Sequence, residues 1–283
     1  MTRADLAARL RGAGIEEARE EALRLFCHFS GYSRAAALAE PAADCADPAL
    51  AAALARRLRR EPLAYILGEC WFCNECYRVG PACLIPRPET EMLVEYAQAH
   101  LPPGGFFADL CTGSGCIAVS LLACRPDARG DAYELSPEAL ALASENALAN
   151  RVDGRLCFYR RDLLLPGAVS PPQPYDMILS NPPYVRRDRM EALSPEVQAE
   201  PRLALDGGED GGRFYAAFLH ELPAVLAPHG CFVFEIGEEQ GAQIRALAEA
   251  AGFVCRIFPD LAGLDRMAVL CRAEAASEGV AKG

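Results

Sequence analysis

Seven short apolar segments alternate with helical runs from residue 105 onward, and this alternation restricts the fold more than any other feature of the sequence. The segments expected to form strands are 106–110, 132–135, 155–159, 176–180, 231–236, 253–258 and 267–271. Helical runs lie between most of them, at 116–124, 137–150, 213–226 and 239–251. Strands that alternate with helices of this length predict an α/β fold with a doubly wound, mainly parallel sheet covered on both faces.

The first 60 residues lack this alternation and predict a small helical bundle. Ala22, Leu25, Phe26 and Phe29 recur at helical spacing, and Asp47 followed by Pro48 is typical of a helix start. We therefore expect a helical domain over 1–60, a β-hairpin linker over 61–87, the sheet-containing domain over 88–275 and a flexible tail over 276–283.

The turn after the first strand of the sheet has the composition of a ligand-binding loop. Glycines there let the backbone approach a ligand, and the following helix offers unpaired N–H groups. Asp109 at the strand end can accept a hydrogen bond from a ligand's amino group, and Glu134 ends the next strand, where a carboxylate holds ribose hydroxyls. We expect a nucleoside ligand, although a dinucleotide or a tight turn without a ligand stays possible. The turn consists of Cys111, Thr112, Gly113, Ser114 and Gly115.

The strand at 176–180 ends abruptly in Asn181-Pro182-Pro183-Tyr184. Two prolines cannot extend a central strand, so the chain must leave the sheet at its carboxyl edge, where doubly wound sheets bind ligands. A planar NH2 group offers two N–H donors, which the Asn181 side-chain oxygen and the Pro182 carbonyl can accept. Tyr184 can lie flat against that planar group. The motif predicts methyl transfer to an amide or amino nitrogen, against the simpler interpretation of a proline-rich turn.

Two further positions have weaker signals. Asp162 can reach an adenine amino group and Leu163 can pack on the ring, but ordinary loop roles explain both equally well. The four histidines fall on helices or a turn, without a nucleophile beside them, and are expected to be structural.

With these residues identified, the chain resembles class I methyltransferases and, more narrowly, the protein-(glutamine-N5) methyltransferases that modify peptide-chain release factors, the PrmC/HemK family. The string Leu84-Ile85-Pro86-Arg87-Pro88-Glu89-Thr90-Glu91 matches the most distinctive string of that family, and Asn181–Tyr184 matches its substrate motif. Further matches lie at 62–68, in the family's interdomain segment, and within 200–211, in a family loop.

The resemblance implies a Rossmann-like, seven-stranded sheet with an antiparallel last strand and S-adenosyl-L-methionine as methyl donor. It implies catalytic roles for Asn181, Pro182 and Tyr184, which together with Pro183 would hold the substrate. The implied substrate is the glutamine of the Gly-Gly-Gln motif of class I release factors, which the helical domain helps to grip. The implied donor site comprises Asp109, Cys111, Thr112, Gly113, Ser114, Gly115, Glu134, Asp162, Leu163 and Asn181.

The chain departs from the family at two of these positions. Cys111 stands where the family has the first glycine of the turn, so the turn is expected to sit slightly differently against the donor. Leu163 stands where an aromatic residue is common, so the packing against adenine is expected to be weaker.

The net charge of −11 and the pI of about 5 argue against stable nucleic-acid binding, because phosphate contacts need a basic face. Two basic clusters at 56–60 and 186–189 moderate this argument, and the first is interpreted as the solvated end of a helix. An amino-group methyltransferase acting on DNA or RNA, such as an N6-adenine methyltransferase, therefore remains the alternative function. No apolar stretch is long enough for a membrane helix and the start lacks a signal-peptide centre, so we expect a cytoplasmic location.

Thirteen cysteines are spread along the chain, and four of them, Cys70, Cys73, Cys76 and Cys83, have spacing that can hold zinc or an iron–sulfur cluster. They lie in an aromatic-rich segment that predicts a hairpin, without a histidine nearby. We interpret them as structural thiols and expect no metal. A metal-binding interaction module, or a protein that binds the donor without catalysis, is the rival of another class.

Overall fold

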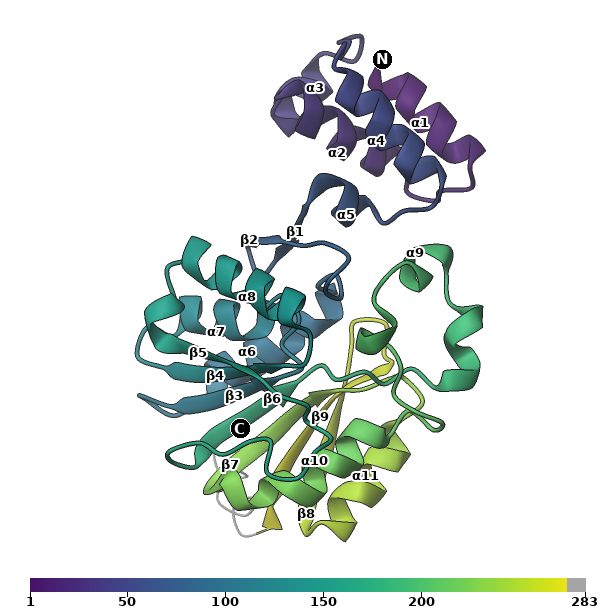
Figure 1. The fold of residues 1–283 in the computed structure, drawn as a ribbon. Helices are drawn as coiled ribbons and strands as arrows, with labels where there is room; N and C mark the ends of the chain where they lie inside the picture. Colours follow the sequence, from purple (N-terminus) through teal and green to yellow (C-terminus); the bar gives the residue numbers. More distant parts are fainter. Residues whose placement is uncertain (274–283) are drawn as a thin grey trace. The chain divides into compact units, whose positions relative to one another are not determined.

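Residues 1–273 are described by a computed structural model, in which the chain divides into two units (Figure 1). The first unit contains residues 1–69 together with 194–199, and the second contains 70–193 and the described residues from 200 onward. The predicted tail at 276–283 lies outside the described residues. Within those residues, no helix is both long enough and apolar enough to cross a membrane.

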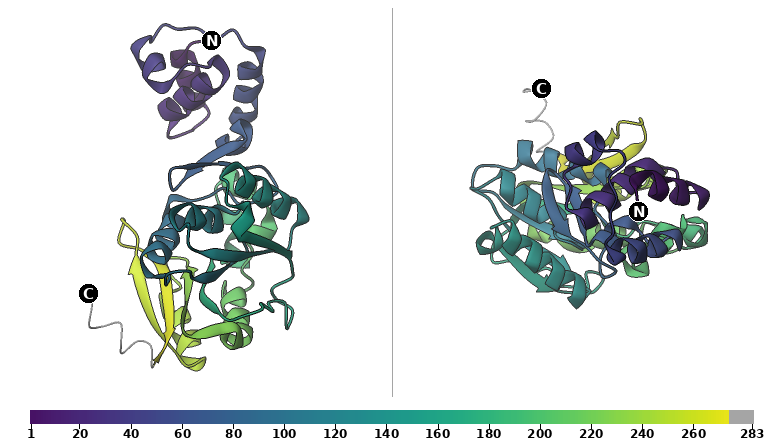
Figure 2. Two further views of the ribbon diagram at one scale, coloured as in Figure 1. Left: turned by 90° about the vertical axis from the view of Figure 1, so that its left-hand side faces the viewer. Right: turned by 90° about the horizontal axis from the view of Figure 1, so that it is seen from above.

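The first unit is a bundle of short helices, most of them drawn in purple and blue in Figure 2, around an apolar core. Thr2 forms a capping box with Asp5. The Asp47 side chain accepts from Ala49 N with Pro48 at the first helical position, as the sequence predicts. Leu25 and Phe26 are fully buried in its core. Its helices are α1 (Arg3–Gly12), α2 (Ala18–Ser30), α3 (Arg34–Ala39), α4 (Pro48–Leu58), α5 (Leu63–Leu67) and α9 (Pro195–Gln198).

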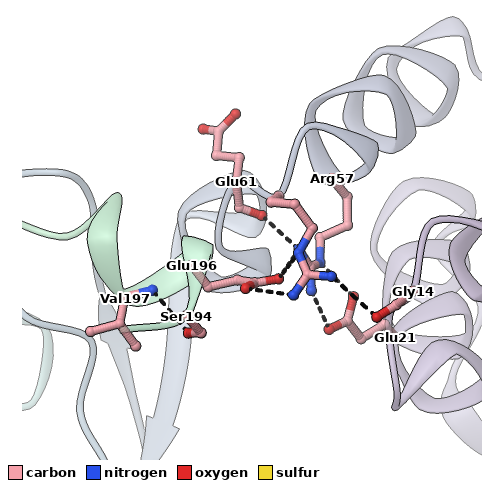
Figure 3. Close-up of polar contacts among 8 residues, drawn as sticks. Gly14, Glu21, Arg57, Glu61, Ser194, Glu196 and Val197 are labelled. Carbon is pink, nitrogen blue, oxygen red and sulfur yellow. Dashed lines mark hydrogen bonds and ion pairs between the residues drawn. The ribbon is translucent and has the colours of Figure 1, made fainter. Parts of the chain in front are cut away.

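A buried arginine holds the distant segment 194–199 within this unit (Figure 3). Arg57 on α4 has a side chain only 5% exposed, and it pairs with Glu21 on α2 at 2.7 Å and with Glu196 on α9 at 2.8 Å. Arg60 pairs with the same Glu196. The interpretation of 56–60 as a solvated helix end is therefore wrong for Arg57, because this side chain is buried. Two carboxylates compensate the burial of its charge.

The second unit contains a seven-stranded sheet with the order β5-β4-β3-β6-β7-β9-β8. Neighbours from β5 to β7 are parallel, while β9 runs antiparallel to both β7 and β8. The predicted α/β class with a mainly parallel sheet and an antiparallel last strand is confirmed. The strands are β3 (Phe106–Leu110), β4 (Arg129–Glu134), β5 (Leu156–Arg160), β6 (Tyr175–Ser180), β7 (Leu226–Glu235), β8 (Phe253–Pro259) and β9 (Asp265–Arg272).

Helices cover both faces of this sheet, with α6, α7 and α8 on one side and α10 and α11 on the other (Figure 1). Their bounds are Glu91–His100, Cys116–Cys124, Pro137–Ala149, Arg213–Glu221 and Gly241–Ala250. The predicted hairpin is present as β1 (Glu69–Phe72) and β2 (Glu75–Arg78). Short 3₁₀ turns η1 to η5 occupy Pro88–Thr90, Asp153–Arg155, Arg187–Ala192, Arg202–Ala204 and Leu222–Val225.

The expected helix at 213–226 is shorter than the sequence suggests. It ends at Glu221 and continues as the 3₁₀ turn η5, because Pro223 has no N–H to donate and its ring hinders a further α-turn. Strand β7 then starts at Leu226, five residues before the expected start.

Candidate functional site

The strand order places a topological switch point between β3 and β6. From β3 the chain continues to β4 and β5 on one side of β3, and then returns to form β6 on the other side. Loops leaving the carboxyl ends of such strands diverge and leave a crevice between them. A cavity of about 470 Å³ lies there, and the predicted residues that line it are Cys111, Thr112, Gly113, Ser114, Glu134, Asp162, Leu163, Asn181 and Pro183.

The turn after β3 has left-handed backbone at three positions. Gly113 has φ 55° and Gly115 has φ 81°. A Cβ on Gly115 would lie 3.1 Å from the Ala143 Cβ of α8, so this glycine permits close helix packing and does not line the cavity. Cys111 adopts φ 59° although it is not a glycine, and this left-handed conformation costs on the order of 1 kcal/mol for a residue with a side chain. Burial raises the pKa of the Cys111 thiol, so this group of the turn is neutral.

Glu134 connects the end of β4 to this turn. One of its carboxylate oxygens accepts from Gly113 N at 3.0 Å, and the other accepts from Leu135 N and Ser136 N. A carboxylate has about four acceptor positions, so roughly one remains for a ligand hydroxyl on the oxygen that Gly113 contacts. The backbone amides also fix the orientation of the side chain within the cavity.

Asp109 lies behind the turn, fully buried, and does not line the cavity. Its Oδ2 accepts from the Thr112 hydroxyl at 2.5 Å and from Ala118 N at 3.2 Å, whereas its Oδ1 is buried without a hydrogen-bond partner. Burial raises the pKa of this carboxyl to about 7, although both hydrogen bonds oppose the shift. The structure thus leaves one oxygen of Asp109 without a donor, behind the turn and outside the cavity lining.

Part of the cavity lining is aliphatic and suits a flat apolar ring. Leu163 is 8% exposed, and Ile117 and Leu135 also belong to the lining. Asp162 also lines the cavity, and its Oδ1 accepts from Leu164 N at 3.0 Å, which leaves acceptor positions on the carboxylate. The aliphatic surface with one adjacent acceptor fits a purine with an exocyclic amino group.

Asn181 follows β6 directly and lines the same cavity, with its Nδ2 donating to the Thr90 hydroxyl at 3.2 Å. Pro183 is also in the lining, whereas Pro182 and Tyr184 are not. The Tyr184 hydroxyl donates to Glu235 at 3.0 Å. Burial, followed by the nearby Glu235 charge, raises the pKa of Tyr184, so this phenol stays neutral.

Three further parts of the site were given no role by the sequence analysis. Two of them line the cavity, Thr90 and the stretch Pro201–Ala204, and the third, Glu235, accepts hydrogen bonds from Thr90 and Tyr184. Thr90 and 201–204 fall within strings that carry the family resemblance, so the signal was present without a role attached to it. Glu235 ends β7, and an acid at the carboxyl end of a strand beside β6 was the available signal.

The four cysteines with metal-like spacing lie in and just after the hairpin β1–β2. Over residues 1–273, no group of three or more His, Cys, Asp or Glu side chains has an arrangement that can hold a metal ion. Burial raises the pKa of Cys73 to about 12 and that of Cys83 to about 11, which disfavours the thiolates that a metal would need.

Comparison with known proteins gives two family matches. The PrmC N-terminal domain model matches residues 2–68, and the methyltransferase small domain model matches residues 88–209. A protein of Pyrococcus furiosus described as a methyltransferase has a similar structure, with a TM-score of 0.53 and 17% identity over 69% of this chain and 87% of that one. That likeness supports the fold alone.

Curated relatives match over most of the chain. The release factor glutamine methyltransferase of Cereibacter sphaeroides is 45% identical over 92% of this chain and 93% of its own length. That of Rhodospirillum rubrum is 40% identical over 95% of this chain and 83% of its own length. The chain therefore belongs to the release factor glutamine methyltransferase family.

Proposed function

We propose that this protein transfers a methyl group from S-adenosyl-L-methionine to the side-chain amide nitrogen (N5) of the glutamine in the Gly-Gly-Gln motif of class I peptide-chain release factors. The observation that carries the proposal is the presence of Glu134 and Asn181 in one cavity at the switch point of the sheet. A nucleoside-binding acid and an acceptor for a planar NH2 group are thereby combined in one site.

The donor side of the proposed site consists of the turn at 111–115 with Glu134, Asp162 and Leu163. Glu134 would accept from a ribose hydroxyl, while Asp162 would accept from the adenine amino group and Leu163 would pack on the ring. Asp109 would attract the amino group of the donor through its unpartnered oxygen. S-adenosyl-L-methionine brings an already activated methyl group, so the protein's task is chiefly to position the acceptor nitrogen.

The acceptor side consists of Asn181, Pro182, Pro183 and Tyr184. The Asn181 side-chain oxygen and the Pro182 carbonyl would accept the two N–H donors of the glutamine amide, with Pro183 in the cavity wall. As the amide nitrogen becomes pyramidal, its N–H groups become more acidic and both hydrogen bonds strengthen, which lowers the barrier. Tyr184 would support the planar group from the side.

The names of the relatives support a release factor as the substrate, and such a substrate would place the activity in translation termination and in the cytoplasm. The alternative is methylation of an amino group of DNA or RNA. The Asn-Pro-Pro-Tyr motif is shared with such enzymes, so the acceptor must be tested directly.

The donor side is tested with Glu134→Ala. Loss of the carboxylate should weaken S-adenosyl-L-methionine binding by at least ~1.5 kcal/mol, roughly tenfold or more, because charge-assisted hydrogen bonds are lost. Isothermal calorimetry measures the affinity, and Glu145→Ala, an exposed position on α8 outside the cavity lining, serves as the control. Unchanged affinity in Glu134→Ala would remove this residue from the donor site.

The acceptor side is tested by tritiated methyl transfer to a purified release factor, to the same factor with its tip glutamine changed to glutamate, and to bare DNA and RNA. Only the glutamine form should be labelled, because a carboxylate has no N–H donors and faces the Asn181 oxygen with like charge. Asn181→Ala should lower kcat by roughly 10²–10³ while donor affinity changes little. Labelling of the glutamate form, or a kcat near the wild-type value in Asn181→Ala, would contradict the proposed clamp.

A further inference from the structure

We infer that Thr90 and Glu235 are positioning residues that fix the Asn181 carboxamide with its oxygen toward the cavity and its NH2 group away from it. This inference rests on the proposed function, in which the Asn181 oxygen receives the substrate N–H. Three hydrogen bonds carry it: Asn181 Nδ2 donates to Thr90 Oγ1, the Thr90 hydroxyl donates to Glu235 Oε2, and the Tyr184 hydroxyl donates to Glu235 Oε1.

The sheet register brings these residues together from distant parts of the sequence. Strands β6 and β7 are parallel neighbours with Ser180 paired to Phe234, so Asn181 and Glu235 occupy the next positions at the carboxyl edge. Thr90 comes from the turn η1 that precedes α6, and it is 2% exposed. One carboxylate thus contacts, directly or through one hydroxyl, both polar residues of the Asn-Pro-Pro-Tyr motif.

The direction of each hydrogen bond sets the orientation of the Asn181 amide. An amide has a donating and an accepting end of nearly equal shape, so its orientation depends on its partners. The Thr90 hydroxyl has a single hydrogen, which it gives to Glu235, and its oxygen can then only accept from Asn181. The NH2 group of Asn181 must therefore face Thr90, which leaves the side-chain oxygen for a donor in the cavity.

Glu235 is placed to orient other groups rather than to take a proton from a substrate. Its side chain is 1% exposed and absent from the cavity lining, and each of its oxygens already accepts from a hydroxyl. Arg266 and Glu89 are the other charged groups that act on it electrostatically, with opposite sign. A buried carboxylate with both oxygens engaged is a rigid anchor for the network.

The test compares Thr90→Val, which keeps the shape of the side chain without its hydroxyl, with Thr90→Ser, which keeps the hydroxyl. In methyl transfer to the release factor, Thr90→Val should lower kcat by about tenfold to hundredfold, because a misplaced acceptor group loses rate of this order. The KM for S-adenosyl-L-methionine should change less than about twofold. Thr90→Ser should recover at least about half of the wild-type kcat. Thr90→Ala is the second hydroxyl-free variant should Thr90→Val fail to fold.

A double-mutant cycle with Asn181→Ala separates positioning from general damage. If Thr90 acts through Asn181, removing its hydroxyl should have no further effect on kcat once the Asn181 amide is absent. Equal losses in Thr90→Ser and Thr90→Val, a wild-type kcat in both hydroxyl-free variants, or additive losses in the cycle would overturn the inference. A normal kcat in Asn181→Ala alone would instead overturn the proposed function.

Discussion

At the scale of the residue, the carboxyl group of Asp109 should make stability depend on pH. Its pKa is about 7 in the folded protein against an ordinary value of 3.8. Between pH 3.8 and pH 7, therefore, the folded protein keeps this carboxyl protonated, whereas the unfolded chain has lost the proton. Its stabilising contribution is therefore complete below pH 3.8 and is lost as the pH rises through 7.

Compared with Asp109→Asn, which does not titrate, the wild-type free energy of unfolding should fall by about 2 kcal/mol between pH 5 and pH 8. Urea denaturation of both proteins without donor measures this, and the difference between them cancels the titration of all other groups. A difference that is the same at both pH values would show that Asp109 ionises normally in the folded protein.

Single residues of the site were predictable where the fold places a strand end beside a ligand crevice. Glu134 ends one recognisable strand, Asn181 follows another, and both line the cavity, so the rule for parallel sheets located them. Thr90 and Glu235 were not assigned, because their roles depend on hydrogen bonds between segments 145 residues apart. Asp109 and Tyr184 were predicted as site residues, but neither lines the cavity, and their exclusion from it depends on packing that no local pattern records.

At the scale of the element, the sequence predicted strands that are apolar throughout, but it did not predict where a strand extends into polar or turn-forming residues. Strand β3 and helix α7 have the predicted bounds, since β3 is buried throughout and α7 is buried from Cys116 to Leu122. Strand β7 includes Pro228, His229 and Gly230, which read as a turn in isolation. The membership of α9 in the helical unit was not predictable, because it depends on Arg57 and Glu196, 139 residues apart.

The ion pairs of Arg57 should stabilise the helical unit far more than exposed ion pairs do. Arg57→Ala leaves Glu21, which is 15% exposed, without its partner, and unpaired charge in such an environment costs about 3–5 kcal/mol. Urea denaturation followed by circular dichroism and hydrogen exchange of the α2 and α4 amides measures the loss.

Arg34→Ala is the matched control, because it breaks a pair with Glu20 in which both side chains are well exposed. This variant should leave the transition unchanged within error. Hydrogen exchange should also rise at 194–199 in Arg57→Ala and in Glu196→Ala, but not in Arg34→Ala. Equal effects of the two arginine substitutions would show that burial adds nothing to the Arg57 pairs.

At the scale of the whole molecule, the fold class followed from the sequence because strand and helix periods alternate over nearly 170 residues. The order of the strands follows from this alternation only in part, since the antiparallel insertion of β9 between β7 and β8 is a property of side-chain packing at the sheet edge. The family resemblance supplied the antiparallel last strand, whereas the number of strands followed from the sequence pattern.

The distribution of charge predicts that bare nucleic acid does not bind. The net charge is −11, and the two basic clusters are largely compensated: Arg56 pairs with Glu61, and Arg186 pairs with Asp188. Binding to phosphates would have to break such pairs and overcome the overall repulsion.

Fluorescence anisotropy with a labelled duplex and a labelled single-stranded RNA should give a Kd weaker than about 10⁻⁴ M even at about 50 mM salt. The double variant Glu61→Gln, Glu196→Gln frees arginines and should bind more tightly than the wild type, which shows that the assay can detect a basic patch. Micromolar binding by the wild type that weakens steeply with salt would contradict the prediction and favour a nucleic-acid substrate.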